Sequence, residues 1–134
     1  MQKTGSCLCG EIKITANNLS SKLWSCHCSM CRNWTGGPFM AVDAGSDVTF
    51  EWEQNISRFI SSDWAERGFC KACGSNLFYY LKPKNQYMLL AGLFENIDEL
   101  EFDHQIFIEE KPECYSFENK TMNMTGKEVF EQFA

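Results

Sequence analysis

The sequence predicts a mainly β fold, with one small domain over residues 1–134 built from many short strands. Three observations predict it. Short apolar or alternating segments are separated by turn-forming residues, a clear helical pattern is confined to the C-terminal end, and seven of the eight cysteines fall in three tight clusters. A chain of 134 residues can bury one core, and eleven Phe, four Trp and four Tyr are available to fill it.

Strands are expected wherever a short alternating or apolar segment is bounded by turn residues. The first, at residues 11–15, alternates polar and apolar side chains directly after the first cysteine pair. The further strands are expected at residues 23–26, 39–42, 48–52, 57–61, 66–69, 77–81, 87–91 and 105–108. Turn formers stand between these segments, and Pro38 and Pro83 fall at their boundaries rather than inside them.

A helical stripe is clear only at residues 127–133. Its apolar members are Val129, Phe130 and Phe133. We expect this helix to pack on the sheet, because its apolar side chains share one face. A helical turn at residues 29–34 would bring Cys28 and Cys31 to one side, and another turn is expected at residues 96–100.

The charge and hydropathy patterns count against two classes of partner. The formal net charge is −6, whereas nucleic-acid binding relies on clustered Lys and Arg. The longest apolar run, at residues 88–91, is too short to cross a bilayer, and no secretory signal follows Met1. We therefore expect neither a nucleic acid nor a membrane partner. We expect a reducing compartment such as the cytoplasm, where clustered cysteines are more often metal ligands than disulfides.

The first and third cysteine clusters form two pairs, each followed by glycine. Their ligand candidates are Cys7, Cys9, Cys70 and Cys73. The glycines Gly10 and Gly74 free the backbone to turn around a metal, as in a zinc knuckle. An ion shared by both pairs would fasten distant parts of the chain together. The pattern favours this structural metal, and the alternatives are an oxidisable Cys-x-x-Cys pair or disulfides between the pairs.

The middle cluster, Cys26, Cys28 and Cys31, supplies three thiolates from six consecutive residues. In one interpretation His27 or the distant Cys114 is the fourth ligand and the site is structural. In the other, the fourth position is open to water or to a substrate thiol, as in catalytic zinc sites, where the metal would lower the pKa of that thiol. If the segment is extended, the His27 side chain points to the opposite face.

The order of the three clusters resembles that of the glutathione-dependent formaldehyde-activating enzyme family, whose domain also occurs in centromere protein V. The resemblance extends from Gly5 to about Ile108 and is specific, because all three clusters keep their order and spacing. The matching segments are Gly5-Ser-Cys-Leu-Cys-Gly10, Cys26-His-Cys-Ser-Met-Cys-Arg32, Arg67-Gly-Phe-Cys-Lys-Ala-Cys-Gly74 with Leu77, and Ala91-Gly-Leu-Phe-Glu95.

The resemblance implies a domain of several coiled antiparallel β-sheets pinned by zinc, similar to methionine sulfoxide reductase B. It implies two zinc ions per chain. The structural ion would be held by Cys7, Cys9, Cys70 and Cys73, and the catalytic ion by Cys26, Cys28 and Cys31. The implied activity is that of a carbon–sulfur lyase, S-(hydroxymethyl)glutathione synthase-like, which adds glutathione to formaldehyde or reverses that addition.

The chain departs from the family pattern near the expected pocket. His104 stands one place before the usual His, whose position Gln105 occupies, and Cys114 replaces a usual Trp. After the Ala-Gly turn, where family members commonly have two acidic residues, this chain has Glu95 followed by Asn96. These departures bear on the substrate more than on the fold.

Several further residues are candidates for roles in such a site. The proton could come from water, Glu95 or His104. The cations that could meet the carboxylates of glutathione are Arg32, Arg58 and Arg67. For each arginine we expect a solvated salt bridge rather than a ligand contact. Trp34 is expected in the pocket wall, and Cys114 is expected to be a buried free thiol.

Three functions compete at this point. The favoured one is a zinc-dependent carbon–sulfur lyase acting on an adduct of glutathione or a related small thiol. The first alternative is a zinc-stabilised interaction module without catalysis, in which both ions are fully ligated by protein. The second alternative is a thiol oxidoreductase that uses Cys70 and Cys73.

Overall fold

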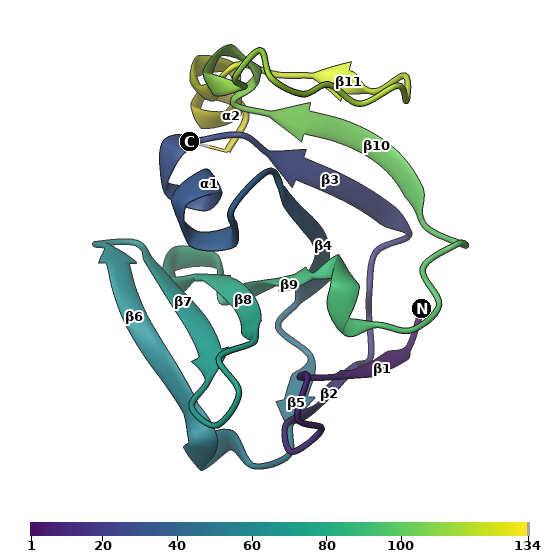
Figure 1. Ribbon diagram of the computed structural model, residues 1–134, viewed down its shortest axis with the longest axis vertical. Coiled ribbons are helices and arrows are strands. Elements are labelled where there is room, and N and C mark those ends of the chain that lie inside the picture. The colour runs from purple at the N-terminus through teal and green to yellow at the C-terminus, as the bar shows by residue number, and fades with distance from the viewer. Residues whose placement is uncertain (134) are drawn as a thin grey trace.

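The computed structural model describes residues 1–133, which form two β-sheets with two short helices. The larger sheet has eight strands in the order β11-β10-β3-β4-β9-β8-β7-β6, and the smaller has three in the order β1-β2-β5. The large sheet curves strongly, so that β6 to β8 turn away from β3 and β10 (Figure 1). The mainly β class predicted from the sequence is confirmed. The predicted domain ends at residue 134, which lies outside the described residues.

The strands are β1 (Lys3–Ser6), β2 (Lys13–Ala16), β3 (Lys22–Cys26), β4 (Phe39–Gly45), β5 (Val48–Phe50), β6 (Ile56–Ser62), β7 (Ala65–Cys70), β8 (Asn76–Leu81), β9 (Gln86–Leu90), β10 (Glu101–Ile106) and β11 (Met122–Asn123). The helices are α1 (Ser29–Thr35) and α2 (Gly126–Phe133). The 3-10 turns are η1 (Glu53–Asn55), η2 (Lys82–Lys84), η3 (Ala91–Leu93) and η4 (Ile108–Glu110). Within residues 1–133, neither helix has the length and apolar character that crossing a membrane would require.

Every predicted strand segment overlaps an observed strand, and two observed strands were missed. Strand β1 contains no large apolar residue, so it lacks the alternating pattern that identifies a strand. Strand β11 has only two residues, both exposed. The segment 96–100 forms one turn, closed by a 3.0 Å hydrogen bond from the Leu100 N–H to the Ile97 carbonyl, and not a helix.

Helix α2 forms where the apolar stripe predicted it, but its packing is partial. The ring of Phe130 contacts that of Phe107 edge-on, with centroids 5.9 Å apart, yet Phe130 remains 60% exposed. Val129 is half-buried, and the side chain of Phe133 lies outside what the structure describes. The stripe therefore marks a helix that is only lightly attached to the rest of the molecule.

The large sheet is mixed, which corrects the expectation of wholly antiparallel sheets. Strand β10 runs parallel to both of its neighbours, β3 and β11, while the other pairs are antiparallel. The chain returns to β3 only after it has formed six other strands, and this long connection permits a parallel pairing. An alternating sequence shows which side chains share a face, but it carries no information on the direction of the neighbouring strand.

The pairing of β3 with its neighbours β4 and β10 determines where the middle cysteine cluster lies. Its last residue, Cys26, lies between Phe39 of β4 and Ile106 of β10. Two residues later Cys28 caps helix α1, because its Sγ accepts a 3.4 Å hydrogen bond from the Cys31 N–H. The three sulfurs are therefore carried by a strand end, a helix cap and the first turn of a helix.

The hydrophobic core has two parts. The larger lies between the two sheets and includes the fully buried Ile12, Ile14, Phe78 and Leu89. The smaller surrounds the middle cysteine cluster, with Phe39 at its centre, and a half-buried Leu90 packs against both parts. This arrangement joins the cysteine cluster to the main core through the central strands of the large sheet.

Glycine at position 68 is required by close packing across β7 and β8. A methyl group at Gly68 would overlap the buried Phe78 ring, which is held by Phe50 and Tyr87. We expect Gly68→Ala to lower the free energy of unfolding by about 1–3 kcal/mol. Urea unfolding followed by tryptophan fluorescence measures this change.

Gly37→Ala is the matched control, because no atom lies within 4 Å of a methyl group built there. Its unfolding midpoint should stay within about 0.5 kcal/mol of the parent protein. If Gly68→Ala and Gly37→Ala lowered the free energy of unfolding equally, the proposed overlap with Phe78 would be contradicted.

Candidate functional site

The four cysteines of the two glycine-flanked pairs converge, with their Sγ atoms all within 4.8 Å of one another. The sulfurs of Cys7 and Cys9 are 3.5 Å apart, and those of Cys9 and Cys70 are 3.9 Å apart. Four sulfurs arranged tetrahedrally at about 2.3 Å from zinc would be about 3.8 Å apart. The group therefore has the donor type and the spacing that a zinc ion requires.

The backbone of both pairs is turned by glycine. Gly10 and Gly74 have φ values of 81° and 76°, a region that side chains with a Cβ rarely adopt. The Gly10 N–H donates to the Cys7 carbonyl at 3.0 Å, and the Gly74 N–H donates to the Cys70 carbonyl at 2.8 Å. These turns direct the sulfurs of each pair toward the same point, as predicted for zinc knuckles.

Ser75 links the two knuckles. Its hydroxyl accepts a 2.9 Å hydrogen bond from the Leu8 N–H and lies 3.2 Å from the Sγ of Cys73. The hydrogen bond from Ser75 lowers the pKa of Cys73 to about 5. No disulfide joins any of the eight cysteines, so the disulfide alternative for these pairs is not observed.

The three cysteines of the middle cluster also converge, and their Sγ atoms lie within 4.8 Å of one another. Cys26 and Cys31 are buried, and Cys28 is half-buried. Among the His, Cys, Asp and Glu residues of the described chain, none joins this group as a fourth member. Neither His27 nor Cys114 therefore takes the position that the structural interpretation assigned to it.

His27 is fully buried and both of its ring nitrogens are occupied. Its Nε2 lies 2.7 Å from the Oε1 of Gln105, which can only accept, so Nε2 carries the proton. Its Nδ1 then accepts a 2.9 Å hydrogen bond from the Tyr115 hydroxyl. Burial lowers the pKa of His27, which favours this neutral form. His27 is thus a structural link between strands and not a ligand.

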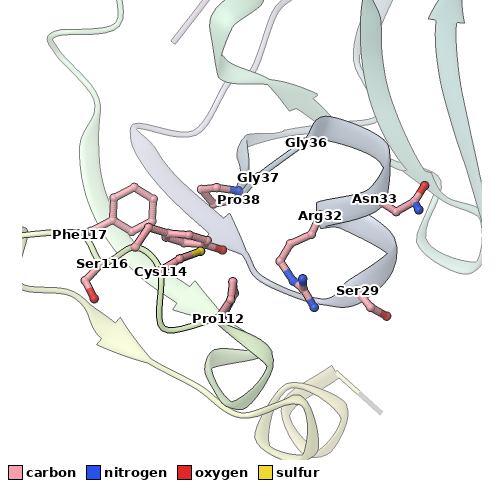
Figure 2. Close-up of a pocket in the computed structure, with 11 residues that line it drawn as sticks. Ser29, Arg32, Asn33, Gly36, Gly37, Pro38, Pro112, Cys114, Ser116 and Phe117 are labelled. Atoms are coloured by element: carbon pink, nitrogen blue, oxygen red, sulfur yellow. The ribbon is translucent and has the colours of Figure 1, made fainter.

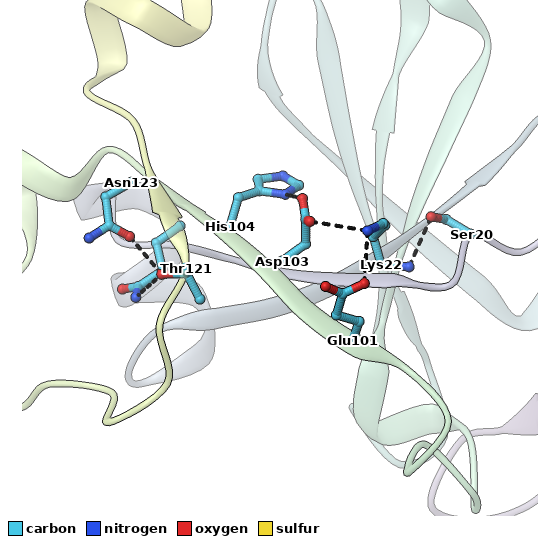
Figure 3. Close-up of polar contacts among 8 residues, drawn as sticks. Ser20, Lys22, Glu101, Asp103, His104, Thr121 and Asn123 are labelled. Carbon is cyan, nitrogen blue, oxygen red and sulfur yellow. Dashed lines mark hydrogen bonds and ion pairs between the residues drawn. The ribbon is translucent and has the colours of Figure 1, made fainter.

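The hydrogen bonds continue from His27 toward the surface. Gln105 donates from Nε2 to the Thr121 hydroxyl at 2.8 Å, and Thr121 donates to the Asn123 Oδ1 at 2.7 Å. Figure 3 shows Thr121 and Asn123 joined in this way. Sequence reasoning singled out neither Tyr115 nor Thr121, because a lone polar residue in a loop carries no pattern.

Arg67 lies next to the middle cluster and is only 5% exposed. Its two terminal nitrogens are 3.7 and 3.8 Å from the Cys31 Sγ, and its guanidinium contacts the rings of Trp34 and Tyr79, each at 5.0 Å. The expectation of a solvated salt bridge is therefore wrong for Arg67. Arg58 forms a salt bridge with Glu66 at 3.5 Å, although both side chains are partly buried. Within the described residues Arg32 forms no salt bridge, so the expectation is wrong for Arg32 as well.

The electrostatics of the middle cluster favour one thiolate in the absence of a cation. Hydrogen bonds from Cys26 and then Cys31 lower the pKa of Cys28 to about 2, and the charge of Arg67 adds to this effect. The hydrogen bonds to Cys28 and Cys31, together with burial, raise the pKa of Cys26 strongly. Three thiolates at this spacing need a divalent cation between them, because their mutual repulsion is weakly screened in a buried site.

The two proposed proton donors lie outside this group of sulfurs. The ring of His104 stacks on Trp24 at 5.8 Å, and its Nδ1 is 2.8 Å from a carboxylate oxygen of Asp103, which also pairs with Lys22 (Figure 3). Glu95 is exposed and borders a cavity of about 500 Å³ that is also lined by Cys7. Neither residue is among those grouped around the middle cluster.

The larger cavity, about 750 Å³, lies between α1 and residues 112–117, and we call it the α1 groove (Figure 2). It is lined by Ser29, Arg32, Asn33, Gly36, Gly37, Pro38, Pro112, Cys114, Tyr115, Ser116 and Phe117. Cys114 is exposed here, which corrects the prediction of a buried thiol. Trp34 is not part of this lining, because it turns inward to stack on Phe39 at 5.8 Å.

The chain matches one protein family model and is similar to a curated protein and to a solved structure. The family model for the glutathione-dependent formaldehyde-activating enzyme matches residues 2–110. An uncharacterized lyase of Schizosaccharomyces pombe is 42% identical over 126 residues, which cover 93% of this chain and 92% of that protein. A crystal structure of a Rhodobacter sphaeroides protein has the same fold, with a TM-score of 0.60 and 24% identity over 69% of this chain and 88% of that chain.

The buried hydrogen bonds of His27 lead to a testable difference between the two histidines of the chain. His27→Ala would leave the buried Gln105 Oε1 without its donor and open a cavity. We expect the free energy of unfolding to fall by about 2–4 kcal/mol. Chemical unfolding of the purified variant measures this loss.

His104→Ala serves as the control, because it removes a partly exposed ring that stacks on Trp24 and a partly exposed contact with Asp103. Its expected cost is below about 1 kcal/mol. A His27 variant as stable as this control would contradict the assignment of His27 as a structural link.

Proposed function

The chain belongs to the glutathione-dependent formaldehyde-activating enzyme family, and on that premise we propose that it is a zinc-dependent carbon–sulfur lyase acting on an adduct of glutathione or a related thiol. The family match and the lyase relative support a lyase-type function. The observation that carries the finer proposal is the middle cluster, with three converging sulfurs and no fourth member among the described His, Cys, Asp and Glu residues.

In the proposed reaction, the sulfur of glutathione forms a bond to the carbon of formaldehyde. The π electrons of the carbonyl move to its oxygen, and the thiol proton ends on that oxygen to give S-hydroxymethylglutathione. The reverse reaction breaks the same carbon–sulfur bond and returns the proton to sulfur. No oxidant or reductant is needed in either direction.

We propose that Cys26, Cys28 and Cys31 hold the catalytic zinc, and that the substrate thiol completes its ligand set. A zinc ion bound there would keep a thiol ionised at neutral pH and polarise a carbonyl as a Lewis acid. The burial of Cys26 and Cys31 limits access of water, and the positive charge of Arg67 lies beside Cys31.

We propose that Cys7, Cys9, Cys70 and Cys73 hold a second zinc with a structural role. Four sulfurs at tetrahedral spacing leave no open position, which is typical of structural sites. Cys7 and Cys9 precede β2, whereas Cys70 ends β7, so this ion would tie the small sheet to the large one. In this role Cys70 and Cys73 would be zinc ligands, which argues against the oxidoreductase alternative.

We assign the proton transfer to solvent water. Glu95 and His104 lie outside the sulfur group, and His27 holds its single proton on Nε2, toward Gln105. The half-buried Cys28 leaves the cluster open to solvent on one side, which supports this assignment. We further propose that residues 1–134 act as one domain in a reducing compartment, such as the cytoplasm, where cysteine thiolates persist.

The alternative function is a zinc-stabilised interaction module without catalysis. It requires the second ion to be fully ligated by protein. His27 and Cys114 were the two residues proposed for that fourth position. The first is occupied by Gln105 and Tyr115, and the second is exposed in the α1 groove. The geometry therefore supports the enzyme over the module.

Metal content and turnover together test the proposal. The purified chain should contain two zinc ions, measured by mass spectrometry, and should convert glutathione and formaldehyde, followed by NMR with labelled formaldehyde. Cys28→Ser should retain one ion and an intact fold while turnover falls at least about 100-fold. Cys70→Ser should lose the other ion and much of its thermal stability, because the structural site contributes folding energy.

Cys114→Ser is the control for thiol chemistry outside the clusters, since Cys114 belongs to neither group of sulfurs. It should keep both ions and an intact fold. Full activity in Cys28→Ser, or a single ion in the parent protein, would refute the catalytic assignment.

A further inference from the structure

We infer that the α1 groove binds the carboxylate-bearing arm of the thiol substrate, and that Arg32 is the residue that holds its carboxylate. This inference rests on the proposed function, because it names the part of the substrate that lies beyond the reacting sulfur. It concerns a site formed by α1 and residues 112–117 and not the cysteines themselves.

The charge of the groove is the first argument. Although the whole chain carries a net charge of −6, Arg32 is the only charged residue among those that line the groove in the described part of the chain. Two charged residues bond to the lining from outside it: Glu110 accepts from the Ser29 N–H, and Lys111 donates to the Tyr115 carbonyl. Within the described residues Arg32 makes no ion pair with a carboxylate. A groove cation without an ion-pair partner favours a ligand that brings its own negative charge.

The position of Arg32 is the second argument. Its Nε donates a 2.9 Å hydrogen bond to the His27 carbonyl, which fixes the side chain at its base. Figure 2 shows Arg32 reaching from α1 toward the segment that carries Pro112 and Cys114. A guanidinium held at Nε keeps its terminal N–H groups for a carboxylate, which it can bind with two parallel hydrogen bonds.

The other two candidate arginines are already engaged. Arg58 pairs with Glu66 and lies over the Phe78 ring, whereas Arg67 is buried against the Cys31 sulfur. Arg32 therefore remains as the arginine that can meet a ligand carboxylate near the middle cluster. From the sequence the three arginines were equal candidates for binding a carboxylate. Their tertiary contacts distinguish them.

The distance between the groove and the sulfurs suits a short peptide. Arg32 follows Cys28 by one helical turn, and its N–H donates to the Cys28 carbonyl at 2.9 Å. Cys28 and Arg32 are therefore in direct backbone contact at the start of α1. A tripeptide spans at most about 11 Å when extended. A tripeptide with a central thiol can therefore place its sulfur at the cluster and a terminal carboxylate at Arg32.

The remaining walls of the groove are suited to the uncharged parts of such a ligand. Tyr115, Phe117, Pro38 and Pro112 offer apolar surface, and the volume of about 750 Å³ falls in the range of small-molecule sites. The Tyr115 hydroxyl is tied to His27, which lies between two of the cluster cysteines. The wall of the groove is therefore anchored to the segment that carries the sulfurs.

Binding of a thiol-blocked ligand tests the groove without requiring turnover. The zinc-loaded full chain is titrated by calorimetry with S-methylglutathione and with its diethyl ester, which lacks both carboxylates. We expect the parent protein to bind the free acid at least tenfold more tightly than the ester. Arg32→Gln should abolish this preference, because only the charged interaction distinguishes the two ligands.

Two further variants separate charge from folding effects. Arg32→Lys loses the Nε bond to His27 but keeps the positive charge, so it should retain a preference of at least threefold for the free acid. Arg58→Gln removes a positive charge outside the groove and should bind both ligands as the parent protein does. Equal affinity of the parent for acid and ester, or an unchanged preference in Arg32→Gln, would overturn the inference.

A small thiol without a carboxylate separates this inference from the proposed function. Arg32→Gln should raise the KM for glutathione about tenfold and should change the KM for 2-mercaptoethanol much less, because 2-mercaptoethanol has no carboxylate. A parent protein that converts neither thiol would refute the lyase proposal, while the calorimetric preference still decides whether the groove binds carboxylates.

Discussion

The structure depends on the close approach of cysteine sulfurs that cannot all be ionised together without a cation. Seven thiol groups form two clusters in which the sulfurs lie within 4.8 Å of one another. In the middle cluster, hydrogen bonds from Cys26 and Cys31 lower the pKa of Cys28, whereas hydrogen bonds to Cys28 and Cys31, burial and the neighbouring charges raise the pKa of Cys26. A divalent cation bound between the sulfurs would allow them to be ionised together and would couple metal binding to the local fold.

The two clusters share one chemistry but differ in their surroundings. The four-sulfur group lies on two glycine turns and joins the small sheet to the end of β7. The three-sulfur group lies where β3 passes into α1, with Arg67 on one side and the His27 hydrogen bonds on the other. A complete ligand set suits a structural role, and an incomplete one beside a groove suits chemistry. We therefore propose different roles for sulfurs of the same kind.

Much of the fold and of the candidate site could be predicted from local patterns. Strands such as β7 and β8 follow from apolar segments between turns, and the cysteine pairs follow from their spacing and the glycines after them. Strand β1 was missed because Lys3-Thr-Gly-Ser6 has no large apolar residue to mark it. The prediction for Arg67 failed because burial against Trp34 and Tyr79 is a property of the packed core and not of the neighbouring sequence.

The sequence by itself determined the β class, the grouping of cysteines into three clusters and the family to which the chain belongs, because these depend on residue types at short spacings. Only the tertiary structure decided that β10 runs parallel to β3, that His27 turns to Gln105 and Tyr115, and that Arg32 faces a groove without an ion-pair partner. These features join residues about 80 positions apart, and such contacts are set by how the whole chain packs and not by any local pattern.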